Sequence, residues 1–387
     1  MSTWSYYLLA LIAAGFWLGS LPALILGFRR VSYLGDVPPL EDAECPRLSI
    51  IVPACNEAAT VEPAMRSLLR VDYPALEIIA VEDRSTDSTG EILDRLAHED
   101  ARLRVLHLGT LPAGWLGKNH ALHQGAALAT GEWLLFTDAD VVYEPDALRR
   151  AVALAQGGDW DHLVAYPQMV AEGFWERAFI SFFMVIFNIR FRTWEAAQKR
   201  GKGYVGVGAF NMVRAGVYHQ LGGHERLKMD VADDVHLGKL IKLSGYRQCL
   251  AEARERIRVR WAFGLRGVIH VLTKNAFAGH DYSWLLIARS IVGLGIVAVW
   301  PWLGLFSGPW PARLLCGTAP VAMLVLQAFF SRRGGAATIY ALAWPLAALL
   351  FLYISIRSGV LTERQRGVYW RGTFYPLDEL RRGLLRG

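Results

Sequence analysis

Long apolar stretches at both ends of the sequence place the strongest constraint on how this chain can fold. Residues 4–28 carry no charged side chain, and three further apolar stretches cover 284–306, 311–330 and 337–356. A helix rises about 1.5 Å per residue, so about 20 apolar residues cross the hydrocarbon core of a bilayer. We therefore expect a transmembrane anchor near the N-terminus and about three transmembrane helices near the C-terminus.

Charges beside the apolar stretches predict the orientation of the chain. Arg29 and Arg30 directly follow the first stretch, which favours the cytoplasm for the residues after them. That stretch lacks the basic start and short apolar core of a cleaved signal peptide, so we expect a retained anchor. Three C-terminal crossings would place the basic tail outside, whereas its charge favours the inside. Pro301 and Pro345 therefore mark two stretches as candidates for a re-entrant or interfacial segment.

The composition limits the classes of partner that the protein can bind and indicates its compartment. The formal net charge is +6, but the Lys and Arg residues form no basic run interleaved with aromatic residues, which argues against nucleic acid. Anionic lipids or small anionic ligands fit the sign of the charge better. The four cysteines are far apart and show no CxxC spacing. This argues against a zinc site or a disulfide framework and for a reducing compartment.

Residues 47–283 alternate between strand-like and helix-like segments. Apolar, β-branched runs predict strands at 48–54, 76–83, 102–108 and 132–140. Helical spacing predicts helices at 58–70, 88–100 and 119–130, the last closed by Gly131 at a C-cap position. This alternation with short links predicts an α/β domain with a parallel sheet and right-handed crossovers.

Polar side chains follow the carboxyl ends of the predicted strands, where an open parallel sheet binds its ligands. They are Asn56 and Glu57 after the first strand, Glu82 and Asp83 at the second, and Asp138 and Asp140 at the fourth. Acids scattered at random would fall at both ends of the strands. The one-sided placement therefore predicts one shared site.

Asp138 and Asp140 are the residues in this set that indicate a ligand. The sequence contains neither GxGxxG after the first strand nor GxxxxGK[ST], so phosphates need another counter-charge. Two carboxylates one residue apart suit Mg²⁺ or Mn²⁺, which would bridge a diphosphate. A solvated turn is the alternative. A phosphatase of the haloacid-dehalogenase type also uses Asp-x-Asp, but on the first strand of its domain rather than the fourth.

Three further segments carry candidate residues, each with a plainer alternative. Lys118 begins the third helix and would form an anion site with the helix amides, or it is a surface lysine. Asp233 and Asp234 open an amphipathic helix, where they either complement the helix dipole or take part in chemistry. Asp87 either caps a helix or binds a ligand. The glycine-rich segment 204–210 either lines an acceptor site or forms a turn.

Several motifs resemble, in order, those of family 2 glycosyltransferases with the GT-A fold. They are "IIVPACNEAATV", "IIAVEDRSTDST", "GEWLLFTDADVVYEPDAL" and "GGHERLKMDVADDVHLG", and the resemblance covers about residues 47–283. "LPAGWLGKNHALHQGA" and "GVYWRGTFY" resemble the membrane-anchored branch that glycosylates lipids, such as carotenoid, hopanoid-associated and ceramide glycosyltransferases. The resemblance implies a Rossmann-like GT-A domain with a parallel or mixed sheet.

The resemblance also implies roles for individual residues. Pro53, Asn56, Glu57 and Asp83 would hold the nucleoside of a nucleotide sugar, expected to be a UDP-sugar. The chain has "VED" where the family usually has two aspartates, and Asp83 keeps the second position. Lys118 and Asp138 would contact the donor, and Asp138 and Asp140 would hold Mg²⁺ or Mn²⁺. Asp234 would be the catalytic base that deprotonates the acceptor hydroxyl as it attacks the anomeric carbon, with inversion.

Two segments bear on the acceptor. The helix expected near 173–194 is either a core helix or an interfacial helix on the bilayer. Arg260 and Trp261 match the end of a Gln-x-x-Arg-Trp motif of polysaccharide synthases, but Ile257 replaces the first residue, which argues against a processive polymerase. Arg260 and Trp261 would contact the donor or lie at the membrane surface. Residues 198–203, "QKRGKG", would serve a polyprenyl phosphate acceptor if that alternative holds.

These expectations define a domain plan and a function. We expect a transmembrane anchor at 1–30, a cytoplasmic GT-A domain at 31–283, a transmembrane region at 284–358 and a basic tail at 359–387. The expected protein is a metal-dependent inverting glycosyltransferase of the bacterial inner membrane that acts on a lipid hydroxyl. A non-catalytic membrane scaffold is the remaining alternative, and the intact acids argue against it.

Overall fold

The computed structural model describes residues 2–334 and 336–385, which fold as two compact units. The helical unit comprises Met1–Arg30, Ala171–Trp194 and Trp261–Arg366. The sheet unit comprises Val31–Val170, Glu195–Arg260 and Gly367–Gly387. This division differs from the expected one, because residues 171–194 and 261–283 group with the apolar helices and the tail from Gly367 groups with the sheet.

Within the described residues, the sheet unit holds a nine-stranded mixed sheet. The order along the sheet is β1 (Ser32–Tyr33), β9 (Gln248–Val259), β7 (His162–Met169), β8 (Asn211–Arg214), β5 (Trp133–Phe136), β2 (Leu48–Ala54), β3 (Leu76–Asp83) and β4 (Leu103–Leu108). The strands from β5 to β4 are parallel, whereas β8 runs antiparallel to both of its neighbours. The predicted α/β fold with a parallel or mixed sheet is confirmed.

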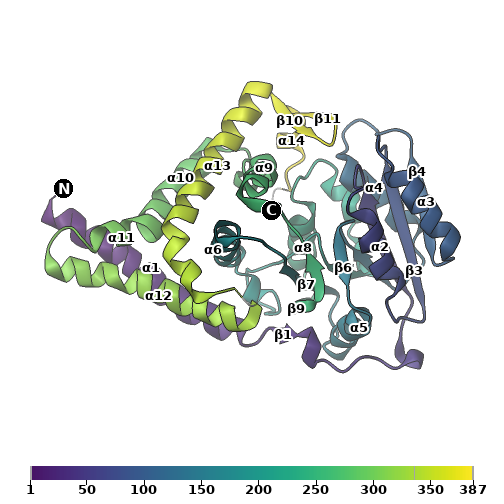
Figure 1. Cartoon of the computed structure of the whole chain (residues 1–387), viewed down its shortest axis with the longest axis horizontal. Helices are drawn as coiled ribbons and strands as arrows, with labels where there is room; N and C mark the ends of the chain where they lie inside the picture. The colour runs from purple at the N-terminus through teal and green to yellow at the C-terminus, as the bar shows by residue number, and fades with distance from the viewer. Residues whose placement is uncertain (1, 335, 386–387) are drawn as a thin grey trace. The chain divides into compact units, whose positions relative to one another are not determined.

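Strands β2 and β3 are buried on both faces, as continuous apolar runs in a parallel sheet must be. Ile50 and Ile78 face the core beneath α2 (Val61–Leu69) and α3 (Thr89–Glu99). Ile51 and Ile79 face the opposite core, beneath α4 (Gly117–Leu128) and α8 (Asp233–Leu243). Helices therefore cover both faces of the sheet (Figure 1).

The expected strand at 132–140 is shorter in the structure. β5 ends at Phe136, which is the last residue paired with β2, and β6 (Val141–Tyr143) pairs antiparallel with β9 instead. Residues 137–140 thus turn away beyond the end of the strand. The expected C-cap at Gly131 is also wrong, because α4 ends at Leu128 and its C-cap is Ala129. Gly131 instead packs against Ser49, whose amide nitrogen would lie 2.6 Å from a Cβ.

Four helices of the described chain are long and apolar enough to cross a membrane, one N-terminal and three C-terminal, as expected. They are α1 (Thr3–Phe28), the segment Trp284–Gly304, α12 (Trp310–Gly334) and the segment Thr338–Gln365. The second segment comprises α10 (Trp284–Leu294), a π-turn (Gly295–Val299) and α11 (Trp300–Gly304). The last comprises η7 (Thr338–Ala343) and α13 (Trp344–Gln365).

Helices α1 and α12 lie side by side and run in the same direction (Figure 1). Ala10 packs with Ala312 near their starts, and the rings of Phe28 and Phe330 are 5.1 Å apart near their ends. A basic pair marks each of these ends: Arg29 and Arg30 follow α1, and Arg332 and Arg333 lie in the last turn of α12.

Helix α13 begins in the middle of this bundle. The ring of Trp344, its first residue, lies 5.9 Å from the ring of Trp17, halfway along α1. Near its other end, a Cβ on Gly359 would meet the ring of Trp284 at 2.9 Å, and Trp284 starts α10. The direction of α13 is therefore from the interior of the bundle back toward the start of α10.

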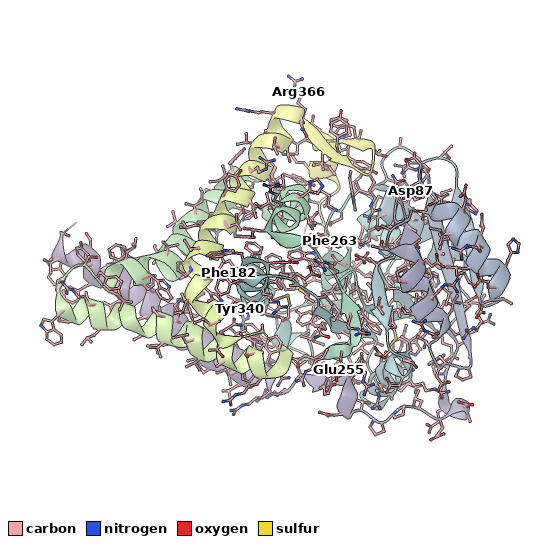
Figure 2. The ribbon with its side chains drawn as sticks, in the orientation of Figure 1. Asp87, Phe182, Glu255, Phe263, Tyr340 and Arg366 are labelled. Carbon is pink, nitrogen blue, oxygen red and sulfur yellow. The ribbon has the colours of Figure 1, made fainter. Side chains whose placement is uncertain are left out.

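The expected helix near 173–194 is α6 (Phe174–Phe191), which packs in the helical unit against α13 and α9 (Gly264–Asn275). Phe182 is fully buried and its ring lies 6.1 Å from that of Trp344 (Figure 2). At the start of the helix, Phe174 and Trp175 are about half exposed. An interfacial role for α6 remains a prediction.

Candidate active site

Lys118 joins two acidic motifs that are far apart in the sequence. Its Nζ lies 2.8 Å from Oδ1 of Asp138, in the turn after β5, and 3.7 Å from Oδ1 of Asp233, at the start of α8. Lys118 itself is the second residue of α4. Three segments that sequence analysis selected separately therefore meet beyond the carboxyl ends of the strands, as expected for a ligand site in such a sheet.

The glycine-rich segment 204–210 separates the two acidic pairs. A Cβ on Gly206 would lie 1.7 Å from the carbonyl oxygen of Asp234, and one on Gly208 would lie 2.3 Å from Oδ2 of Asp138. Real Cβ atoms do not approach other atoms so closely, so a side chain at Gly206 would clash with backbone, and one at Gly208 would require the Asp138 carboxylate or the loop to move. The amide of Asp138 donates to the Gly208 carbonyl at 3.0 Å, and the Asn211 side chain donates to the Asp234 carbonyl at 3.1 Å. This segment therefore fixes both acidic pairs.

Buried carboxylates give the site an excess of negative charge. Burial, with Asp138 and Glu57 nearby, raises the pKa of Asp140 to about 7. Burial also raises the pKa of Asp233 to about 7, where Lys118 opposes the shift and Asp234 adds to it. The pKa of Asp234 is raised by burial as well. A group of carboxylates with raised pKa values is typical of a functional site and favours binding of a cation.

Lys118 remains charged in this setting. Burial lowers its pKa, but attraction from Asp138, Asp233 and Asp234 outweighs burial and raises the pKa above its ordinary value. A permanent cation at a helix N-terminus is suited to binding the phosphates of a ligand.

The loops after β2 and β3 are tied to each other. Oδ1 of Asn56 accepts a hydrogen bond from the Thr86 amide at 2.8 Å, and Ser85 Oγ accepts from the Asn56 amide at 3.1 Å. Asp83 forms a two-point ion pair with Arg84, at 2.8 Å to Nε and 3.1 Å to Nη2. The loops that contain the predicted nucleoside residues thus lie together at one edge of the sheet, next to Gly117 of α4, where a Cβ would meet Oδ2 of Asp83 at 2.3 Å.

Asp87 has the capping role. Its Oδ1 accepts from the Thr89 amide at 3.0 Å at the start of α3, and its Oδ2 accepts from the Ala58 amide at 3.1 Å. Both carboxylate oxygens of Asp87 therefore accept from backbone amides, which agrees with the capping alternative.

A C-terminal hairpin that was not predicted as part of the site contacts its residues. β10 (Gly367–Trp370) and β11 (Thr373–Pro376) pair antiparallel around Arg371 and Gly372. Arg371 forms an ion pair with Glu57, and the Tyr375 hydroxyl accepts from the Gly117 amide at 3.0 Å. The signal was "GVYWRGTFY", in which aromatic runs flank a two-residue turn.

Three other residues have distinct positions. Pro53 lies in β2 opposite Val81 of β3. The Trp261 ring stacks 5.1 Å from that of Phe183 in the helical unit, so the structure does not group this side chain with the acids. Arg260 is the last residue of the sheet unit before the chain enters the helical unit.

His224 is a neighbour of the site that sequence analysis could not rank. Its Nε2 lies 3.9 Å from Oδ2 of Asp233, and its Nδ1 is 2.9 Å from the Tyr218 hydroxyl. Burial lowers its pKa to about 3, so the imidazole is neutral and adds no positive charge.

The donor atoms at Asp138 and Asp140 fit a divalent cation in their chemistry. In residues 2–334 and 336–385, no group of three His, Cys, Asp or Glu side chains is arranged to hold a metal ion. Two carboxylates are nevertheless a common protein share of a Mg²⁺ site, because phosphate and water oxygens supply the remaining ligands. The oxygen-only character of the pair matches such a hard cation.

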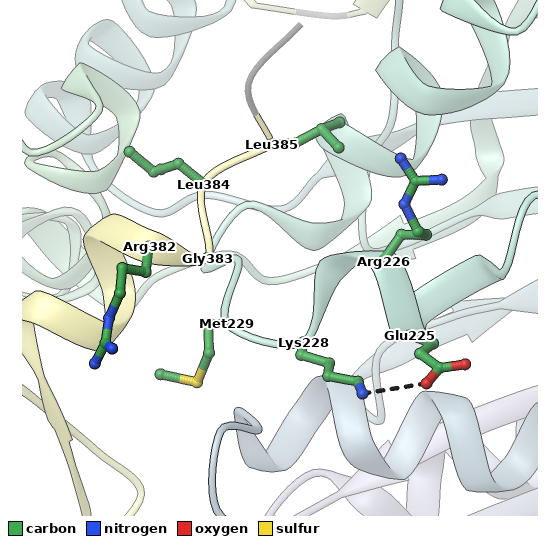
Figure 3. Close-up of a pocket in the computed structure, with 8 residues that line it drawn as sticks. All are labelled: Glu225, Arg226, Lys228, Met229, Arg382, Gly383, Leu384 and Leu385. Atoms are coloured by element: carbon green, nitrogen blue, oxygen red, sulfur yellow. Dashed lines mark hydrogen bonds and ion pairs between the residues drawn. The ribbon is translucent and has the colours of Figure 1, made fainter.

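A separate pocket of about 370 Å³ lies between residues 225–229, at η4 (Gly223–Leu227), and residues 382–385 (Figure 3). Its charged lining residues are Glu225, Arg226, Lys228 and Arg382, and Lys228 pairs with Glu225 at 3.1 Å. None of the acids around Lys118 lines it. The pocket is therefore distinct from the candidate active site.

Comparison with solved structures supports this description of the fold. The mannosyltransferase PcManGT from Pyrobaculum calidifontis, in complex with GDP-Man and Mn²⁺, superposes with a TM-score of 0.54 at 21% identity. The match covers 91% of this chain and 98% of that chain. The sheet with its two layers of helices is therefore of the GT-A type.

Comparison with protein families gives a match inside the sheet unit. The model of Glycosyl transferase family 2 matches residues 49–222. The match contains both loops of the predicted nucleoside site, Lys118 and the pair Asp138 and Asp140.

Curated relatives agree with the family. Glycosyltransferase AglD of Haloferax volcanii is 36% identical over 121 residues, which are 30% of this chain and 18% of that protein. Beta-monoglucosyldiacylglycerol synthase of a Nostoc species is 37% identical over 113 residues, 29% of this chain and 24% of that protein. The 4,4'-diaponeurosporenoate glycosyltransferase of Staphylococcus aureus is 22% identical over 339 residues, 86% of this chain and 89% of that protein. The first two matches thus span a quarter or less of their relatives.

Proposed function

We propose that this protein is a membrane-bound glycosyltransferase that moves a sugar from a nucleoside diphosphate sugar to a lipid hydroxyl with inversion. The observation that carries the proposal is the meeting of Asp138, Lys118 and Asp233 at one point of a family 2 domain. Two relatives are named for monoglucosyldiacylglycerol and 4,4'-diaponeurosporenoate, which favours a lipid-type acceptor for this chain. A UDP-sugar remains our choice of donor.

Asp234 is the proposed catalytic base. In an inverting transfer, the acceptor hydroxyl forms a bond to the anomeric carbon, the bond to the diphosphate breaks, and the hydroxyl proton goes to a carboxylate. Burial raises the pKa of Asp234 and so makes it a better proton acceptor near neutral pH than an exposed aspartate. The hydrogen bond from the Val235 amide to its Oδ1, 2.8 Å long, fixes the carboxylate.

Lys118 and the turn that contains Asp138 and Asp140, called the DxD turn, are proposed to stabilise the leaving diphosphate. The Lys118 ammonium is charged and lies within 2.8 Å of Asp138, where diphosphate oxygens would compete for it. Asp138 and Asp140 would hold Mg²⁺ or Mn²⁺, which neutralises negative charge on a diphosphate when bound. Asn56, Glu57 and Asp83 would line the nucleoside end.

The position of the C-terminal tail supports a specific membrane topology. Residues 367–387 belong to the same compact unit as residues 31–170, so the chain must cross the membrane an even number of times between Trp261 and Arg366. Three candidate helices lie in that interval, and therefore one of them does not cross.

We assign the non-crossing element to η7 and α13. The basic ends of α1 and α12 point the same way, and both favour the cytoplasm. The segment after α12 thus starts on the cytoplasmic side, reaches Trp17 in mid-bundle and returns along α13 toward Trp284. Pro345 in the first turn of α13 suits such a re-entrant segment, which removes the conflict between three crossings and a basic cytoplasmic tail.

Lipid analysis of cells with and without the gene tests the function. We expect a glycolipid that is present only when the gene is intact and that is restored by the wild-type gene but not by an Asp234→Asn variant. Unchanged lipids together with a changed soluble glycan would contradict a lipid acceptor.

A further inference from the structure

We propose that the C-terminal hairpin is part of the donor site and that Arg371 binds the diphosphate of the nucleotide sugar. The inference rests on the proposed function and deepens it, because it names a second phosphate-binding cation at the same site. The juxtaposition that carries it is Arg371 beside Glu57, while Lys118 lies beside Asp138.

Contacts that do not involve Arg371 fix the hairpin to the site. The Tyr375 hydroxyl bonds the Gly117 amide, the first residue of α4, next to Lys118. Thr373 Oγ1 lies 3.4 Å from Nη1 of Arg84, which itself holds Asp83. The hairpin therefore spans from the loop after β3 to the N-terminus of α4, and its turn is left facing the loop after β2.

The turn places an unusual residue in this position. Arg371 and Gly372 have φ of 47° and 79°, the left-handed conformation that a two-residue hairpin turn requires. Asn and Gly adopt this conformation readily, whereas arginine is disfavoured. The turn therefore fixes the backbone at the point where the Arg371 side chain reaches Glu57.

The side chain of Arg371 is held by acids but remains accessible. It is 40% exposed, whereas its partner Glu57 is 20% exposed. Partial burial lowers its pKa, but Glu57 and Asp138 outweigh this effect, so the guanidinium lies within the field of the DxD turn. An arginine in this position can exchange a carboxylate for two phosphate oxygens, because its planar fork matches both groups.

Lys118 and Arg371 thus form a pair of cations from distant segments around one group of acids. A diphosphate presents more negative charge than a monophosphate and extends over a longer distance. We therefore expect Lys118 to contact one phosphate and Arg371 the other, with the hairpin closing the donor site.

The test is nucleotide binding to the full chain in lipid nanodiscs, measured by calorimetry with UMP, UDP, GMP and GDP. For the base that the wild-type protein binds, we expect Arg371→Gln to weaken diphosphate binding about tenfold to a hundredfold, since a charge-assisted hydrogen bond is lost. Monophosphate binding should change by less than about threefold. The diphosphate affinity of Arg371→Lys should lie between those of the wild-type protein and Arg371→Gln, because lysine keeps the charge but lacks the planar fork of the guanidinium.

Arg366→Gln is the matched control. Arg366 has a similar backbone conformation, with φ of 55°, and its side chain is exposed and points away from the ribbon (Figure 2). This variant removes the same charge and should bind diphosphates like the wild-type protein. A loss in Arg366→Gln equal to that in Arg371→Gln would overturn the inference.

Two further results would contradict the role of Arg371 but leave the proposed function intact. Equal losses for monophosphate and diphosphate in Arg371→Gln would indicate a merely structural hairpin, and unchanged binding would remove the side chain from the site. A wild-type protein that binds neither UDP nor GDP would instead overturn the proposed function, and the inference with it.

Discussion

Lys118 holds Asp138 at 2.8 Å although 20 positions separate them in the sequence, and the same ammonium faces Asp233 at 3.7 Å. One cation therefore connects the turn after β5 to the first turn of α8. The predicted donor side and the predicted base side of a transfer reaction meet at this residue.

Replacing Asp234 with Asn should separate binding from chemistry. The amide keeps the shape of the side chain but cannot accept the acceptor proton, so we expect transfer to fall by about a hundredfold to ten-thousandfold. Nucleotide binding should stay within about threefold of the wild-type value, because Asp234 is assigned to the acceptor face. Single-turnover transfer and calorimetry measure the two quantities.

The control for this variant is Asp378→Asn, which changes an exposed aspartate of α14 (Leu377–Arg382). It should transfer sugar at the wild-type rate. Wild-type turnover in Asp234→Asn would remove Asp234 from the role of base.

Replacing Gly208 with Ala should displace the DxD turn. The added methyl group would lie 2.3 Å from Oδ2 of Asp138, so either the carboxylate or the loop must move. We expect activity to fall by at least about tenfold, since small misplacements at a reacting centre are costly. Gly216→Ala is the matched control, because nothing lies within 4 Å of its Cβ position. Similar activity of the two variants would show that the close approach at Gly208 has no functional consequence.

The stability of the protein should depend on pH through Asp233. Its pKa is raised to about 7 in the folded state, against about 4 in an unfolded chain, so the folded state binds the proton more tightly. The stabilisation that protonated Asp233 adds to the free energy of unfolding is therefore fully present below pH 4 and is lost as the pH rises to 7.

An Asp233→Asn variant removes this titration. We expect the melting temperature of the variant, minus that of the wild-type protein, to be higher at pH 8 than at pH 5. Both are measured on the full chain in detergent. Asp378→Asn should show the same difference at both pH values. A pH-independent difference for Asp233→Asn would contradict the raised pKa.

Sequence periodicity was sufficient to predict β2 and β3, because each has an apolar, β-branched centre that is buried on both faces. It could not predict that β5 stops at Phe136. The chain leaves the sheet there because β6 pairs with Val259 and Arg258 of β9, more than 100 residues later. Such pairing is a property of the tertiary structure rather than of local propensity.

The position of the acids could be predicted from local sequence, whereas the position of the hairpin could not. Asp138 and Asp140 follow a strand directly, so their place at the edge of the sheet follows from local sequence. Arg371 lies more than 300 residues from its partner Glu57, and a helical segment intervenes. Its role was visible only as an aromatic segment with a two-residue turn, which has no fixed position in a sheet.

The topology predicts which loops are accessible from each side of the membrane. A cysteine at Ser307, between α11 and α12, should react with an impermeant maleimide added outside intact cells. A cysteine at Asp378 in the tail should react only after the membrane is opened. Reaction of the tail cysteine from outside would show that α13 crosses and would contradict the re-entrant assignment.

Transfer of a labelled sugar by the purified full chain tests the central claim most directly. The wild-type protein in nanodiscs made from the lipids of its own host is supplied with a panel of radiolabelled UDP- and GDP-sugars and Mn²⁺. We predict that the label of one donor passes into the organic phase and that the Asp234→Asn variant transfers none above background. Label that remains with the nucleotide, or that appears only as free sugar in water, would contradict the account.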